Sequence, residues 1–191
     1  MKLYIVGSVA SGKSTLARRL SAKTGIPCYA LDSFVHKPDK AGAFGNTKRS
    51  ETERDKLFAE ALQGDCILED TGRACFAEGL RRADRIVVLD LPRRVRYRRI
   101  LLRYIKQKLG IEPCGYTPSL KMVRCMFRWA KAFDTGADGV KQRAAPYADK
   151  TVVLRSLAEV RKCEEDFSRL IMKCGKRIAN TGTARRTTGS A

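Results

Sequence analysis

Short apolar runs alternate with longer amphipathic stretches along this chain. Five runs have the length and composition of buried parallel strands and cover residues 2–6, 26–31, 66–68, 85–89 and 151–154. Apolar residues recur at helical spacing in the stretches 15–24, 51–63, 74–81, 92–109, 119–133 and 157–172. Because alternating strands and helices join through right-handed crossovers, the pattern predicts a doubly wound, three-layer α/β/α fold around a five-stranded parallel sheet.

The segments between these elements differ in composition. Residues 36–50, 111–118 and 135–139 are rich in turn-forming residues and are predicted to be loops. Beyond Gly175 the chain consists mainly of Thr, Gly, Ser, Ala and Arg, so we expect residues 175–191 to form a disordered basic tail. A length of 191 residues fits one core, and the sequence therefore predicts one domain over 1–174.

The segment from Gly7 to Ser14 matches the pattern G-x-x-x-x-G-K-[ST] and lies between a predicted strand and a predicted helix. Its glycines let the backbone curl so that N–H groups point at a phosphate chain. Lys13 is placed to reach the β and γ phosphates, and Ser14 to bind Mg²⁺. The motif predicts a nucleoside triphosphate held by Gly7, Ser8, Val9, Ala10, Ser11, Gly12, Lys13, Ser14 and Thr15.

Charge is unevenly distributed. The chain has a formal net charge of +19, and residues 92–131 carry twelve Lys and Arg side chains against one acid, Glu112. Three interpretations stay open: a solvated helical face, a clamp over nucleotide phosphates, or a nucleic-acid-binding surface. The basic residues are Arg93, Arg94, Arg96, Arg98, Arg99, Arg103, Lys106, Lys108, Lys121, Arg124, Arg128 and Lys131.

Composition narrows the remaining classes of protein. The seven cysteines are scattered without a C-x-x-C motif and His36 is the only histidine, so neither a disulfide framework nor a zinc site is predicted. No apolar run has the length of a membrane span, and no secretory signal precedes the first strand. We therefore expect a cytoplasmic protein without a membrane partner.

With these elements placed, the chain resembles the adenylate-kinase-like P-loop kinases, and within them the group of DNA topology modulation proteins. The resemblance covers roughly residues 1–172 and rests on GSVASGKST, ALDSFVHKP, ILEDTGR, RIVVLDLPRRVRYRRILLR and VVLRSLAEV. It implies ATP and Mg²⁺ as cofactors and an NMP-kinase-like sheet with a short basic lid at approximately 104–120. The turn Thr71-Gly72-Arg73 departs from the nucleoside-monophosphate kinases, which carry a glycine-phenylalanine-proline-arginine turn there.

The resemblance also assigns arginines to the nucleotide. The aspartate-x-proline at Asp90 is followed in adenylate kinases by an arginine that stacks on adenine and another that contacts ATP phosphates. By position these are Arg99 and Arg103, and a shift in register would substitute Arg96 or Arg98. The pair Arg124 and Arg128 is a candidate for further phosphate contacts or simply a solvated face, and the loop 155–157 resembles the family's adenine-bordering loop.

The remaining candidates concern the phosphoryl acceptor and the metal. Asp32 follows the second strand, where kinases of this fold often carry a carboxylate that binds or deprotonates the acceptor hydroxyl; alternatively it caps the next segment. Asp70 ends the third strand and is a candidate for holding a Mg²⁺-bound water. Arg73 is placed to meet an anionic acceptor, whereas His36 is interpreted as a polar loop residue.

These observations lead to two main hypotheses and a weaker third. In the first, the protein is an ATP-dependent kinase whose catalytic residues are Lys13, Asp32 and Arg103 and whose acceptor is a small molecule or a nucleotide. In the second, it is a nucleic-acid-associated ATP-binding protein or a polynucleotide 5′-hydroxyl kinase. The third is a slow ATPase that works as a switch. The acceptor and the oligomeric state stay open.

Overall fold

A computed structural model describes residues 1–39, 45–112, 114, 116–167 and 169. Its main sheet has five parallel strands in the order β2-β5-β1-β6-β7, which confirms the predicted fold class. The strands are β1 (Lys2–Gly7), β2 (Cys28–Ala30), β5 (Cys66–Asp70), β6 (Arg85–Leu89) and β7 (Thr151–Leu154). Since every strand runs in the same direction, all their carboxyl ends meet at one edge.

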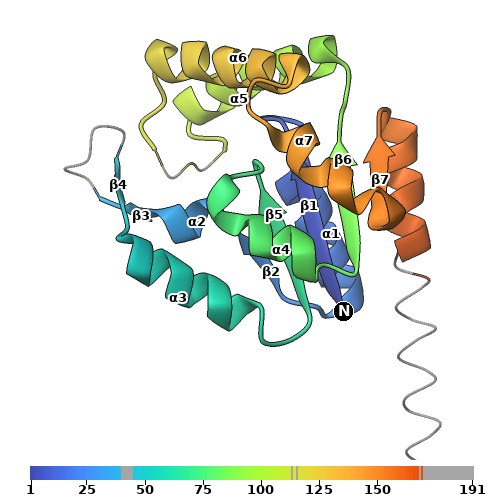
Figure 1. Ribbon diagram of the computed structural model, residues 1–191. Coiled ribbons are helices and arrows are strands. Elements are labelled where there is room, and N and C mark those ends of the chain that lie inside the picture. The colour runs from blue at the N-terminus through green and yellow to red at the C-terminus, as the bar shows by residue number, and fades with distance from the viewer. Residues whose placement is uncertain (40–44, 113, 115, 168, 170–191) are drawn as a thin grey trace, which may run out of the picture.

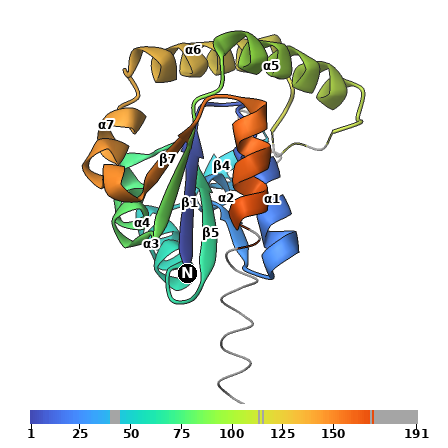
Figure 2. The ribbon, with the colours of Figure 1, turned by 90° about the vertical axis from the view of Figure 1, so that its right-hand side faces the viewer.

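Helices cover both faces of this sheet. Figures 1 and 2 show α1 (Lys13–Thr24) and the helix over residues 157–167 on one face. The other face carries α3 (Glu51–Ala61), α4 (Ala77–Arg82) and α7 (Val140–Ala144). The antiparallel pair α5 (Arg93–Lys108) and α6 (Leu120–Thr135) lies across the carboxyl edge (Figure 1). The sheet and its two helical layers confirm the α/β/α arrangement.

Alternation along β1 supplies the core on both faces. Leu3 and Ile5 pack with Leu16 and Leu20 of α1, whereas Tyr4 joins the cluster on the α3 and α4 side. All five side chains are buried. Burying an aliphatic side chain of this size contributes about 1.5–3 kcal/mol, so β1 is held firmly from both sides. The loop that follows β1 therefore starts from a rigid position.

Several short elements were not predicted. Residues 36–50 contain an antiparallel hairpin, β3 (His36–Pro38) and β4 (Asn46–Lys48), and α2 (Asp32–Val35) precedes it. A further 3-10 segment, Ala145–Lys150, follows α7. Elements of three to six residues are too short to show a hydrophobic period, which explains why the sequence pattern missed them.

The boundaries at the lid and at the C-terminus also bear on the predictions. The predicted lid, 104–120, includes the end of α5, and only residues 109–119 connect the two helices. The predicted tail, 175–191, lies outside the described residues. In the part of the chain that the structure describes, no helix is long and apolar enough to cross a membrane.

Candidate active site

The P-loop runs from the end of β1 into α1 and depends on two glycines for different reasons. Gly12 has φ +101°, a left-handed conformation that favours glycine, and it caps α1. A Cβ on Gly7 would lie 2.6 Å from the Leu89 carbonyl oxygen, so this position needs glycine for the close approach of β6. The loop therefore leaves the N-terminus of α1, with its free N–H groups, open to a phosphate.

Lys13 is buried beside the loop it belongs to. Its ammonium donates a hydrogen bond to the Ser8 carbonyl oxygen at 2.9 Å and lies 3.7 Å from Glu69 Oε1. Burial lowers the pKa of Lys13; Glu69 and Asp70 act against this shift, while Arg103 and Arg73 reinforce it. Two further cations thus converge on Lys13, an arrangement that favours a polyanionic ligand.

One of the two predicted nucleotide contacts, Arg99, lies against the P-loop. The Arg99 guanidinium donates to the Ser11 carbonyl oxygen at 2.8 Å and passes close to Gly12. Among the described residues, the buried Ser11 hydroxyl and Arg103 Nε have no hydrogen-bond partner. Arg103 Nε lies 3.1 Å from Glu112 Oε1 as an ion pair whose geometry does not make a hydrogen bond. Buried polar groups without partners are rare, and phosphate oxygens would satisfy both.

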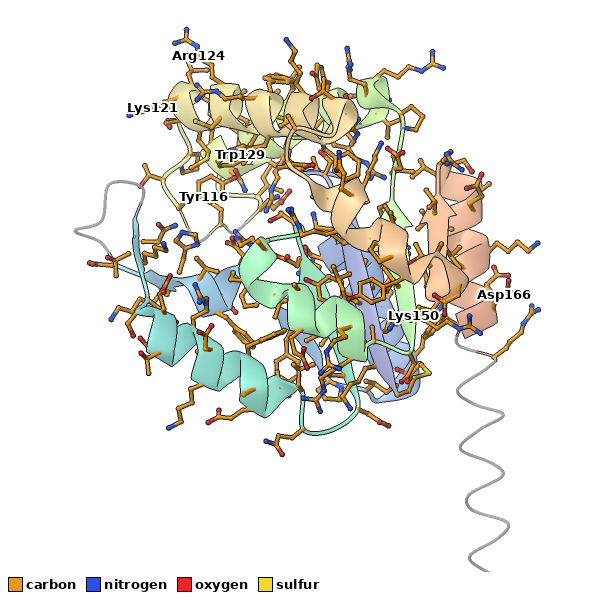
Figure 3. The ribbon with its side chains drawn as sticks, viewed as in Figure 1. Tyr116, Lys121, Arg124, Trp129, Lys150 and Asp166 are labelled. Carbon is orange, nitrogen blue, oxygen red and sulfur yellow. The ribbon has the colours of Figure 1, made fainter. Side chains whose placement is uncertain are left out.

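The other arginines considered from the sequence are arranged differently. Arg96 is buried, donates to protein oxygens and is therefore not available to stack on adenine. Arg98, Arg124 and Arg128 are exposed. Figure 3 shows Arg124 on the outer side of α6, away from the main sheet. This position argues against contacts between Arg124 or Arg128 and a nucleotide in the P-loop, and leaves a solvated face or a nucleic-acid-binding surface as the interpretations for this pair.

Three charged side chains from different parts of the chain meet on the other side of Lys13. Arg73 donates from one end of its guanidinium to Asp70 at 2.9 Å and from the other to Asp32 at 2.5 Å. The Asp70 side chain is fully buried, while the Asp32 side chain is 67% exposed. His36 Nδ1 lies 3.7 Å from Asp32. Asp32 and Asp70, each of which follows a strand, are thus joined through Arg73 at the sheet edge, and Asp32 is open to an incoming molecule.

Asp70 has a different environment from the one expected of a metal-water ligand. Its carboxylate accepts hydrogen bonds from the Tyr4 hydroxyl, the backbone N–H groups of Gly72 and Arg73, and the Arg73 side chain. Because its oxygens accept hydrogen bonds from protein donors, Asp70 stabilises the turn at Gly72 and Arg73 and orients the Arg73 side chain. Burial, together with Asp70, also raises the pKa of Tyr4 well above its usual value.

A magnesium ion would fit a different set of groups. Ser14 is exposed at the first turn of α1, where its hydroxyl is accessible. Glu69 points to the P-loop side of β5 because side chains alternate along a strand, opposite to Asp70. The described residues contain no group of three or more His, Cys, Asp and Glu side chains suited to a metal. Nucleotide phosphates would have to supply most ligands, as is usual for Mg²⁺.

Sequence reasoning missed Arg143 and gave no role to Gly72. Arg143 of α7 donates from Nε to the Gly72 carbonyl oxygen at 3.0 Å, although 71 positions separate them. Gly72 has φ +87°, and a Cβ there would lie 2.6 Å from Val140 Cγ2. The glycine in Thr71-Gly72-Arg73 could have been used to predict a turn. Nothing in the sequence predicts that this turn contacts Arg143.

The P-loop between β1 and α1, at the edge of a five-stranded parallel sheet, defines a P-loop protein of the three-layer α/β/α class. The family model AAA_18, described as an AAA domain, matches residues 3–112, more than half of the chain, and the chain belongs to this family. No curated protein matches the sequence.

Solved structures share the fold. A shikimate kinase from Bacteroides thetaiotaomicron aligns with a TM-score of 0.53 at 16% identity, covering 90% of this chain and 98% of that one. A shikimate kinase from Acinetobacter baumannii in complex with shikimate gives 0.52 at 16% identity, covering 90% and 93%. At this identity the likeness establishes the fold, a P-loop kinase fold. Membership of the DNA topology modulation group stays a prediction.

Proposed function

We propose that the protein is a kinase that transfers the γ-phosphoryl group of ATP to a hydroxyl group of a small molecule. The observation that carries the proposal is the buried Lys13 ammonium, held against the P-loop carbonyl of Ser8, together with Arg73, which holds the exposed carboxylate of Asp32 at the same edge of the sheet. Phosphoryl transfer depends on positioning and on stabilising the charge of the transferring group. Lys13 and Arg103 provide the positive charge there, and Arg99 is proposed to contact the nucleotide beside Gly12.

Asp32 and Arg73 are proposed to receive the acceptor. The exposed carboxylate of Asp32 accepts a hydrogen bond from the acceptor hydroxyl and takes its proton as the oxygen attacks. Arg73 is fixed by Asp70, so its outer guanidinium edge is held toward Asp32 and is suited to an anionic or hydroxylated acceptor. Such an acceptor would replace part of the Arg73–Asp32 ion pair.

Mg²⁺, when bound with ATP, neutralises phosphate charge and orients the γ-phosphoryl group. We assign Ser14 to this ion. Glu69 replaces Asp70 as the carboxylate proposed to face the metal's water shell, because it lies on the Lys13 side of β5. The P-loop N–H groups hold the phosphates. The α5–α6 pair, which lies across the carboxyl edge of the sheet, limits the access of water to the site.

A transfer screen tests this function. The purified protein is incubated with γ-³²P-ATP and Mg²⁺ and with separate pools of hydroxy acids, sugars, nucleosides and nucleotides, and Lys13→Ala provides the blank. We expect a labelled product with one pool of small hydroxylated acceptors. Release of inorganic phosphate at the same rate with every pool and with none would identify an ATPase and refute the kinase assignment.

A polynucleotide 5′-hydroxyl acceptor is the second candidate. It is favoured by four exposed basic residues of α6, Lys121, Arg124, Arg128 and Lys131. Figure 3 shows Arg124 on the outer side of this helix. A 5′-hydroxyl oligonucleotide in the same screen separates the two candidates. Polynucleotide binding through this face would weaken steeply between 50 and 200 mM salt, by about 10³-fold for six phosphate contacts. Labelling of the oligonucleotide that disappears in Arg124→Glu/Arg128→Glu would favour this candidate.

A further inference from the structure

Arg96 is the largest fully buried side chain in the described structure, and it sits at the base of α5. Its guanidinium donates from Nε to the Leu91 carbonyl oxygen at 2.8 Å and from Nη1 to the Ala130 carbonyl oxygen at 3.2 Å. Nη2 donates to the carboxylate of Asp134 on α6. A buried arginine with this many partners is held in one orientation.

The fourth partner of Arg96 belongs to the P-loop. Nη1 also donates to the Ser8 hydroxyl oxygen at 2.9 Å. The carbonyl oxygen of the same Ser8 accepts the hydrogen bond from Lys13 Nζ. Ser8 is therefore held from both sides, by Arg96 through its side chain and by Lys13 through its backbone. This single residue connects a buried arginine of α5 with the lysine of the nucleotide site.

We propose that Arg96 is a positioning residue that fixes the P-loop, through Ser8, in the conformation that binds ATP, and that Asp134 carries this constraint to α6. The inference rests on the proposed use of the P-loop for ATP. Asp134 neutralises the Arg96 charge, and the side chain is 1% exposed, so Arg96 acts through geometry and not through its field on the phosphates. The α5–α6 pair is consequently anchored to the loop it covers.

Arg93 offers a matched control. Its Nε donates to the same carboxylate, Asp134 Oδ2, at 2.9 Å, yet its side chain is 58% exposed and no hydrogen bond joins it to the P-loop. Replacing either arginine by lysine keeps the charge and removes the planar fork of donors. Only the change at Arg96 breaks the connection to Ser8.

The test is a double-mutant cycle on binding of a fluorescent ATP analogue, which requires no acceptor. We expect Arg96→Lys and Ser8→Ala each to weaken binding about tenfold, and the double variant to be no weaker than Arg96→Lys; this non-additivity corresponds to a coupling of about 1.4 kcal/mol. Arg93→Lys should bind as the wild type does, and Ser8→Thr, which keeps the hydroxyl, should restore most of the affinity lost in Ser8→Ala.

Two outcomes would overturn the proposal: additive losses in the cycle, or equal losses in Arg93→Lys and Arg96→Lys. A purely structural role for Arg96 predicts lower melting temperatures without coupling to position 8. Ser8→Ala keeps the Arg96–Asp134 pair and so remains informative if Arg96→Lys folds poorly. Phosphoryl transfer is measured separately, and its absence alongside a coupled cycle would refute the kinase assignment while leaving the role of Arg96 intact.

Discussion

The two sides of Lys13 are built in different ways. On the nucleotide side, the P-loop takes its binding groups from consecutive residues between β1 and α1, and much of the binding surface is backbone. On the proposed acceptor side, Asp32 comes from the start of α2, Asp70 from the end of β5, and Arg73 from the turn beyond it. The first site is local in sequence, and the second exists only after the sheet has formed.

This difference separates what the two sites specify. Backbone N–H groups recognise any phosphate chain, so the nucleotide side needs little more than a loop of the correct shape. Side chains from separate elements recognise the shape and charge of one acceptor. These side chains can be replaced by other residues without changing the conformation of the P-loop. In the proposed kinase, the nucleotide side therefore indicates the type of reaction, and the proposed acceptor side decides the substrate.

The largest effect is expected on the nucleotide side, from Lys13→Ala. Removing the buried ammonium takes away charge stabilisation at the γ-phosphoryl group, and kcat/KM for ATP should fall about 10³-fold. Steady-state transfer kinetics with the acceptor found in the screen provide the measurement. The KM of the acceptor should change little, because Lys13 contacts the loop. A larger effect on the acceptor than on ATP would contradict the division between the two sides.

Asp32→Asn should act on the other side and is expected to rank second. An amide keeps the size of the side chain but does not take a proton, so kcat should drop about 10²-fold. Affinity for ATP, measured by calorimetry, should be unchanged within error. Asp39→Asn is a control on an aspartate of the same region, and it should retain full kcat. A parallel loss of ATP affinity in Asp32→Asn would place Asp32 on the nucleotide side.

Sequence and structure agree most closely where the information is local. The P-loop, its flanking elements and the parallel sheet were predictable from a motif and from apolar runs. Asp32 and Asp70 could be placed from the sequence because each follows a predicted strand, but the hydrogen bonds that Asp70 accepts from the turn after it depend on a geometry that no periodicity encodes. Arg96 was one of many arginines in a basic helix, and only packing against α6 distinguishes it from Arg98.

Gly72→Ala should affect the acceptor side through stability. A methyl group there meets Val140 Cγ2 at 2.6 Å and forces φ +87° on a residue with a side chain, so we expect a loss of about 3 kcal/mol in unfolding free energy. Gly110→Ala is the matched control: φ is +69° with no atom within 4 Å, and the cost should be about 1 kcal/mol. Urea denaturation measures the unfolding free energy of both variants. Equal losses would show that Val140 moves away from the added methyl group without an energetic penalty.

The smallest effect should come from a charged contact at the end of α1 away from the P-loop, between Lys23 in the last turn and Glu164 of the helix over 157–167. Lys23 Nζ donates to Glu164 Oε1 at 2.6 Å, and this hydrogen bond lowers the pKa of Glu164 below its usual 4.5. A depressed carboxyl pKa stabilises the fold above the unfolded value, and that contribution is lost as the pH falls through the folded pKa. Since Lys23 is 47% exposed, the contribution should stay below about 1 kcal/mol.

Urea denaturation of the wild type and Lys23→Met between pH 7 and pH 3 measures this contribution. The wild type should be slightly more stable at pH 7, and the two curves should converge below pH 4.5 as Glu164 takes up its proton. Lys56→Met, on the exposed side of α3, removes a helical lysine for which no ion pair is observed in the described structure and should run parallel to the wild type. A constant difference between wild type and Lys23→Met down to pH 3 would mean that the contribution of Lys23 does not depend on the charge of Glu164. Arg19, whose Nη1 lies 3.5 Å from Glu164 Oε2, would then be the residue of α1 that carries the pH-dependent contact with the helix over 157–167.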